Sequence, residues 1–112
     1  MKNIGVQAAA IPEYLDNLLK DTEYWIEHKT YSTDEIAARF HHRLVTIHPF
    51  PNGNGRHARL MTEALQDQLG IERFTWGSAS LLKEGEARTA YLSALKKADQ
   101  GDYKDLIAFS RS

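Results

Sequence analysis

The stretch HPFPNGNGRHAR, residues 48–59, decides the fold because it separates two helical patterns. Pro49 disfavours helical backbone angles at His48, so the helix on its N-terminal side should end at about Ile47. The residues that follow, up to Gly53, form a loop. A further helix is then expected from about Gly55 to Leu69.

Helical periodicity extends from this stretch in both directions. On the N-terminal side, Ser32 and Glu35 form a capping-box signature that starts the second helix of the chain. The apolar residues of that helix recur at helical spacing: Ile36, Phe40, Leu44 and Ile47. The first helix has Pro12 in its first turn, and its expected apolar stripe consists of Leu15, Leu18, Leu19, Tyr24, Trp25 and Ile26. In the third helix, which Gly70 should terminate, the expected inward-facing residues are Leu60, Ala64 and Leu65.

The rest of the chain is predicted to be almost entirely helical. A helical stretch over residues 79–82 and about 86–98 is interrupted near Gly85, Gly101 ends it, and Asp102 caps a last short helix. Only the segment Lys2 to Gln7 is predicted to be a short extended piece. Helices with short connections predict an all-α fold.

Composition indicates a soluble globular protein with one domain over residues 1–112. Of the 112 residues 42% are hydrophobic, and 14 lysines and arginines against 15 acidic residues give a formal charge of −1. This balance disfavours nucleic acid as a partner, and no apolar run approaches the roughly 20 residues of a membrane span. The absence of cysteine excludes disulfides and thiol nucleophiles. We expect a cytoplasmic protein that binds neither nucleic acid nor membrane.

The loop and the start of the third helix carry the candidate chemistry. Gly53 and Gly55 allow positive φ angles and close approach of a ligand to the backbone. Backbone N–H groups and the dipole at a helix start favour a phosphate, and Arg56 and Arg59 oppose that dipole unless an anion lies between them. A titratable His48 beside this cradle suggests general-base chemistry on a nucleotide or phosphate ester. On physical grounds alone, a plain Pro- and Gly-rich turn that binds no ligand remains the alternative.

The same stretch resembles the signature of the Fic family, HxFx(D/E)GNGRxxR. Its eight defined positions are occupied by His48, Phe50, Asn52, Gly53, Asn54, Gly55, Arg56 and Arg59, and all of them match the signature except Asn52. The flanks FHHRLVTIHPF and RLMTEALQDQLG are similar to the family's paired central helices. From about Asn3 to its end, the chain resembles the subgroup called mobile mystery protein B. The resemblance implies a Fic-like helical core with the active loop between two central helices.

The resemblance also implies a reaction, the transfer of the AMP moiety of ATP to a Ser, Thr or Tyr hydroxyl of a target protein. By this analogy His48 takes the hydroxyl proton, and the backbone N–H groups from Gly53 through Asn54 to Gly55 bind the α- and β-phosphates. Arg56 and Arg59 hold the outer phosphates. Phosphoryl-type transfers depend mainly on positioning and charge stabilisation, which suits this division of roles.

The N-terminal segment and Asn52 complete the expected site. Ile4, Gly5 and Val6 resemble part of one strand of the family's flap hairpin, which clamps the target as an added strand. Asn52 stands where the family usually has the Asp or Glu that ligates Mg²⁺, and a carboxamide oxygen is a weaker ligand for a hard cation.

Two departures from the family pattern, Asn52 and a short N-terminus, keep alternatives open. The chain begins inside the flap and is expected to lack the helices that precede it in the family. One alternative is a catalytically weak or inactive nucleotide-binding and interaction module. The other is transfer of a different phosphate-containing group on the same scaffold.

Regulation and metal binding have weaker sequence signals. Ser80 to Gly85 fits the family's inhibitory pattern (S/T)xxxE(G/N), but it follows the active loop too closely, so an inhibitory antitoxin-like partner is expected instead. The adjacent His41 and His42 point in different directions on a helix. No HExxH pair exists, which disfavours zinc.

Overall fold

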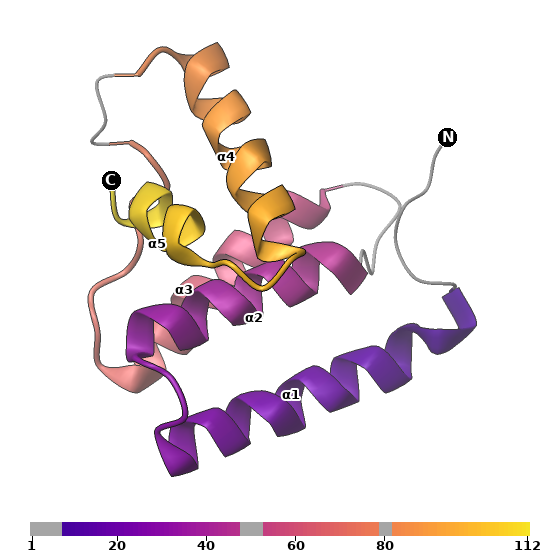
Figure 1. Ribbon diagram of the computed structural model, residues 1–112. Helices are drawn as coiled ribbons and strands as arrows, with labels where there is room; N and C mark the ends of the chain where they lie inside the picture. The colour runs from indigo at the N-terminus through magenta and orange to yellow at the C-terminus, as the bar shows by residue number, and fades with distance from the viewer. Residues whose placement is uncertain (1–7, 48–52, 79–81) are drawn as a thin grey trace. The chain divides into compact units, whose positions relative to one another are not determined.

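The computed structural model describes residues 8–47, 53–78 and 82–112. A short 3-10 helix, η1 (Ala8–Ala10), precedes the α-helices α1 (Ile11–His28), α2 (Thr33–Ile47), α3 (Asn54–Leu69), α4 (Glu84–Ala98) and α5 (Lys104–Arg111), as Figure 1 shows. Every regular element in the described part of the chain is helical, which confirms the predicted all-α class. None of these helices is long and apolar enough to cross a membrane. The chain divides into two compact units, residues 1–71 and 72–112.

In the first unit, α2 packs against both α1 and α3 (Figure 1). The apolar positions predicted for the core of α2 are all buried: Ile36, Phe40, Leu44 and Ile47. They form one cluster with Leu18 of α1 and with Ala58 and Leu65 of α3. Burial of a large aliphatic side chain stabilises the fold by about 1.5–3 kcal/mol, so this cluster holds α2 and α3 together.

Local hydrogen bonds fix the helix ends that the sequence predicts. The Ser32 hydroxyl accepts a hydrogen bond from the Glu35 N–H at 3.1 Å, as expected for a capping box. The Glu35 carboxylate accepts a bond from Arg39 Nε one turn later, at 2.8 Å. At the other end of this unit, Gly70 terminates α3 with a φ of 71°, a left-handed conformation that glycine adopts without strain.

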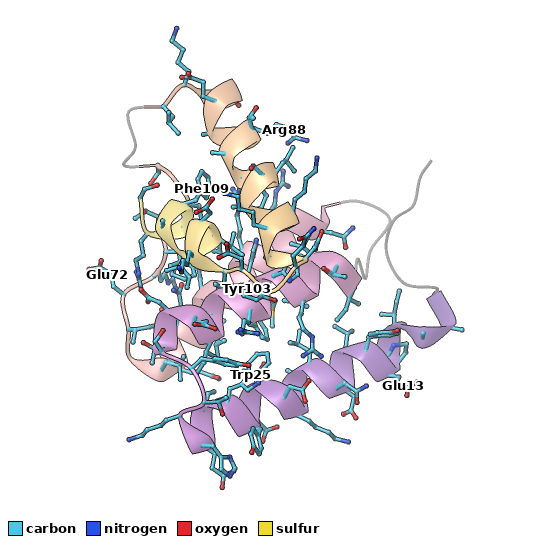
Figure 2. The ribbon with its side chains drawn as sticks, viewed as in Figure 1. Glu13, Trp25, Glu72, Arg88, Tyr103 and Phe109 are labelled. Carbon is cyan, nitrogen blue, oxygen red and sulfur yellow. The ribbon has the colours of Figure 1, made fainter. Side chains whose placement is uncertain are left out.

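Trp25 holds α1 along α2. Its ring points from α1 toward α2 (Figure 2) and meets the Tyr31 ring edge-on, with 5.6 Å between centroids. The Arg43 guanidinium of α2 lies over Trp25 at 5.9 Å and pairs with Asp21 of α1 at 2.7 Å. The C-terminal half of α2, which leads toward the candidate site, is therefore tied to α1 by stacking and charge together.

The predicted apolar stripes are wrong at five positions, which are exposed: Leu19, Tyr24, Ile26, Leu60 and Ala64. The physical reason is clearest in α3, where polar residues occupy part of the buried face. Thr62 and Gln66 are fully buried, and the Thr62 hydroxyl donates a hydrogen bond to the Ala58 carbonyl at 2.7 Å. Because this bond satisfies the buried hydroxyl, hydrophobicity alone assigns the wrong side of α3 to the core.

In the second unit, α4 and α5 pack against each other. The N–H groups of Thr75 and Trp76 both donate to the Ser110 carbonyl, at 2.9 and 2.8 Å, and so join the segment before α4 to α5. Gly77 has a φ of 81°, and a Cβ there would lie 2.8 Å from the Phe109 ring. Both the backbone angle and the close approach of this ring require glycine at that turn.

The start of α4 differs from the prediction. Gly85 does not interrupt the helix but lies in its first turn, after Glu84. The Lys83 N–H donates to the Glu86 carboxylate at 3.1 Å, and this cap fixes the helix start before the glycine. Of the helical piece predicted at 79–82, residues 79–81 lie outside the described residues, and Leu82 is not helical.

The N-cap residue of α5 is Tyr103, one residue after the predicted Asp102. An Asp102 carboxylate oxygen nevertheless accepts a hydrogen bond from the Lys104 N–H, the first of α5, at 3.1 Å. Lys97 of α4 pairs with Asp105 of α5. The end of α4 and the start of α5 are thus joined by a local cap and an ion pair.

Candidate functional site

Gly53 begins the candidate site, because it is the residue from which α3 starts. It has a φ of 75° and a ψ of 14°, in the left-handed region. Its carbonyl accepts the N–H of His57 at 3.0 Å, the first hydrogen bond of the helix. The positive φ expected within this glycine-rich stretch is confirmed at this position, where a side chain would be strained.

Gly55 lies in the first turn of α3. Apart from its chain neighbours and the helix backbone, a Cβ built at Gly55 or at Gly53 would meet no atom of the described residues within 4 Å. Packing within the described structure therefore does not account for a glycine at position 55. Cβ atoms of helical residues tilt toward the helix N-terminus, so the missing side chain leaves room where a ligand would approach the first N–H groups.

The charge at the start of α3 is positive. Among the described α-helices, α3 alone has no acidic residue in its first turn. Instead Arg56 lies there, exposed, and Arg59 follows one turn later, half-buried. Residues three apart share one side of a helix. Two guanidinium groups and the dipole therefore act together, and this field favours a bound anion.

His41 is the residue near this site that sequence reasoning missed. It lies in α2, and its side chain is fully buried. Burial lowers the pKa of His41 to about 3; the backbone of Ala58 in α3 opposes this shift, while the charge of Arg59 and the neighbouring His42 add to it. The ring is therefore neutral at physiological pH. The sequence signal for its burial was its position three residues before Leu44, which places both on the same side of the helix.

The remaining predicted site residues lie outside the described residues: His48, Phe50, Asn52, Ile4, Gly5 and Val6. Ser80, which opens the short inhibitory pattern, lies outside them as well. Within the described ranges, no group of three or more His, Cys, Asp or Glu side chains could hold a metal ion. The structure thus describes the phosphate-binding half of the predicted site and leaves the catalytic base, the metal ligand and the flap as predictions.

Comparison with known proteins places this geometry in context. The Fic/DOC family model matches residues 3–66, which include α1, α2 and the first part of α3. Protein adenylyltransferase fic-1 of Caenorhabditis elegans is 33% identical over 109 residues, which make up 95% of this chain and 20% of the relative. Protein adenylyltransferase Fic of Aedes aegypti is 30% identical over the same length, 95% of this chain and 20% of the relative.

A solved structure shares the arrangement of the helices. Fic-1 from C. elegans superposes with a TM-score of 0.62 at 31% sequence identity, over 89% of this chain and 29% of that one. The chain thus spans about a fifth of the length of the curated relatives it matches.

Proposed function

The chain belongs to the Fic/DOC family, and on this premise we propose that it transfers the AMP moiety of ATP to a hydroxyl side chain of a target protein. One observation carries the proposal: the start of α3 combines a left-handed Gly53, a Gly55 whose Cβ position no described residue crowds, and two arginines without an acidic residue in the first turn. The printed names of the relatives, protein adenylyltransferases, support it.

In this proposal the backbone at the start of α3 binds the α- and β-phosphates. The N–H groups from Gly53 to Gly55 form the anion hole, and the Asn54 side chain assists them. Arg56 and Arg59 hold the outer phosphates, with Arg59 closest to the γ-phosphate. Donors fixed in a helix start need no rearrangement as negative charge builds up in the transition state.

His48 acts as the general base of the transfer. The target hydroxyl oxygen forms a bond to the α-phosphorus, its proton passes to the His48 ring, and the bond from that phosphorus to the bridging oxygen breaks. Pyrophosphate leaves with the electron pair of that bond. His48 is the next residue in the chain after Ile47, the last residue of α2.

The metal in this proposal is a Mg²⁺ ion bound to the phosphates of ATP, whose charge it neutralises. Mg²⁺ usually keeps several waters and takes one or two protein ligands besides phosphate oxygens. Asn52 would supply one neutral oxygen where the family usually has a carboxylate. The open, positively charged start of α3 suits the triphosphate. A single carboxamide oxygen would bind the metal only weakly.

The target and the partners follow from the same family analogy. The acceptor is a Ser, Thr or Tyr hydroxyl, and Ile4, Gly5 and Val6 form a flap strand that holds the target segment. An antitoxin-like protein inhibits the enzyme in trans, as in a toxin–antitoxin pair, and the protein acts in the cytoplasm. Within the family we assign the chain to the mobile mystery protein B subgroup, as a single Fic-like domain over residues 1–112.

Asn52 favours a second candidate function. If the weaker metal ligand limits transfer, the protein acts as a nucleotide-binding interaction module with low activity or none. The same substitution is compatible with transfer of a different phosphate-containing group. Both alternatives use the same site at the start of α3 and differ from the main proposal only in the chemical outcome.

Radiolabelled ATP separates these functions. We expect target protein in a cell lysate to be labelled when the label is on the α-phosphate and to remain unlabelled when it is on the γ-phosphate. Labelling from the γ-phosphate would indicate phosphoryl transfer instead. If neither form labels protein, even with the Asn52→Asp variant, the protein is an interaction module.

A further inference from the structure

We propose that the outer face of α1 is a docking surface for a basic amphipathic helix of a partner protein. This outer face consists of Leu19, Glu23, Ile26 and Glu27, whose spacing along the chain places them on one side of the helix. None of the four belongs to the proposed phosphate site at the start of α3. A partner could therefore bind here whether or not the protein transfers AMP.

The outer face lies beside the side of α1 that packs against α2. Leu18 and Thr22 are buried on the packed side, and the Trp25 ring points toward α2 (Figure 2). Leu19 and Ile26, in contrast, are 54% and 37% exposed. They lie seven residues apart, which is the heptad spacing at which apolar side chains of one helix meet those of another. Isolated apolar residues on a surface are ordinary, whereas two at this spacing present a seam to a second helix.

The charge of α1 is strongly negative. Its 18 residues include five carboxylates and one lysine. Two of the carboxylates pair with cations: Asp16 with Lys20 at 2.9 Å, and Asp21 with Arg43 of α2 at 2.7 Å. The single lysine of the helix is therefore already engaged, and it belongs to an exposed pair next to the outer face.

The two carboxylates of the outer face, Glu23 and Glu27, are not explained by stability. Both are exposed, and within the described ranges neither forms an ion pair. They lie four residues apart, a spacing at which like charges on a helix repel each other. Glu27 also lies in the last turn of α1, where a negative charge opposes the helix dipole. Cations supplied by a partner would relieve both unfavourable interactions.

Charge complementarity decides between the possible occupants of the outer face. A second copy of the chain would bring the same carboxylates to this face, and like charges opposite each other cost affinity. Anionic lipid headgroups and nucleic acid phosphates are repelled for the same reason. A helix with lysine or arginine beside its apolar side suits both features of the surface, because it covers Leu19 and Ile26 and pairs with the two carboxylates.

Two synthetic peptides of equal length serve as probes. Both have leucines at heptad spacing and alanines elsewhere, and they differ only in the flanking positions, which are lysine in the basic peptide and glutamate in the acidic one. In fluorescence anisotropy with the full chain, we expect the Kd of the basic peptide to be at least about tenfold lower than that of the acidic one. Added salt should narrow this difference, because it screens exposed charges.

Matched variants locate the binding on α1. Glu27→Gln should weaken binding of the basic peptide about threefold, the value of an exposed ion pair, and Leu19→Ser about tenfold, as for an apolar contact at the centre of an interface. Glu13→Gln removes a carboxylate from the first turn of the same helix and should leave the Kd unchanged. Glu27→Gln should also raise the midpoint of thermal unfolding by about 2 °C, which separates lost binding from damage to the fold.

Three results would overturn the inference. Equal Kd values for the two peptides would show that charge does not select the partner. Equal losses of binding in Glu27→Gln and Glu13→Gln would place the peptide elsewhere on the protein. Self-association in sedimentation velocity without peptide, abolished by Leu19→Ser, would make a second copy the occupant. None of these measurements uses ATP, so a protein that transfers nothing but shows the expected Kd values would refute the proposed function and leave the docking surface in place.

Discussion

Replacing Gly55 by alanine should separate the stability of α3 from its function. Gly55 is helical, its φ is not positive, and a Cβ at this position would meet no atom of the described residues within 4 Å. Alanine is more favourable than glycine in a helix by about 0.5–1 kcal/mol, because it restricts the unfolded chain. We therefore expect Gly55→Ala to raise the free energy of unfolding by about 0.5 kcal/mol, the lower end of that range.

The same substitution should weaken nucleotide binding. The added methyl group would tilt toward the N-terminus of α3, into the space that the phosphates occupy in the proposed site. We expect the Kd for ATP to rise about tenfold or more, which corresponds to a loss of about 1.4 kcal/mol of binding free energy. A more stable protein that binds ATP less tightly is an outcome that general damage to the fold cannot produce.

Denaturant unfolding and titration calorimetry measure the two effects on the same preparation. Gly53→Ala provides the matched control for the stability measurement. An alanine held at the left-handed φ of 75° is strained and should lower the free energy of unfolding by about 1–2 kcal/mol. If Gly55→Ala binds ATP as tightly as the wild type, phosphates do not approach this part of the backbone. The start of α3 would then not be an anion hole for ATP.

Three further predictions concern single side chains. Arg59→Ala should weaken ATP binding by about 1.5–3 kcal/mol, the value of a lost charged hydrogen bond, and identical affinity in calorimetry would remove its role. Asn52→Asp should strengthen Mg²⁺-dependent ATP binding, because a carboxylate suits this cation; an unchanged Mg²⁺ titration would show that residue 52 does not face the metal. His41 gains a proton below about pH 6.5 when unfolded but only near pH 3 when folded. The free energy of unfolding should therefore fall as pH drops through this window, by up to about 5 kcal/mol. The His41→Met variant lacks the titrating ring, so denaturation at a series of pH values should show a smaller loss of stability.

Periodicity and capping signals were enough to predict the all-α fold and most helix ends. The core of α2 was predicted correctly because Ile36, Phe40, Leu44 and Ile47 recur on one side of a helix that is buried along its length. Ser32 marked the start of the same helix because the hydrogen bond that its hydroxyl accepts from the Glu35 N–H is local. Signals of this kind need no knowledge of the neighbouring helices.

The errors arise where a residue's place depends on its partners, either across the core or in a helix cap. Leu60 was expected to face inward but is 61% exposed, because α3 turns its Thr62 and Gln66 side toward the core. Gly85 was expected to break a helix, but the Lys83 cap starts α4 before it. Helix propensity and hydrophobicity describe a residue alone, whereas these outcomes depend on partners for buried polar groups and on caps.

The candidate site could be predicted only in part for a related reason. The sequence indicated Gly53 at the helix start and two arginines on one side of α3, and both features follow from local geometry. The link between His41 and Ala58 joins residues 17 positions apart in the sequence. No local sequence pattern indicates such a contact. The sequence therefore suggested only one role for His41, metal binding, and disfavoured it.

The substitution His48→Ala tests the central claim most directly, with ATP binding and protein labelling measured on the same full-length variant. The account predicts that labelling from the α-phosphate falls by about 100- to 10,000-fold, the usual effect of removing a general base, while ATP affinity stays nearly unchanged. Labelling that persists at the wild-type rate would contradict the assignment of His48 as the base. Joint loss of ATP binding and stability would instead show that His48 only supports the loop.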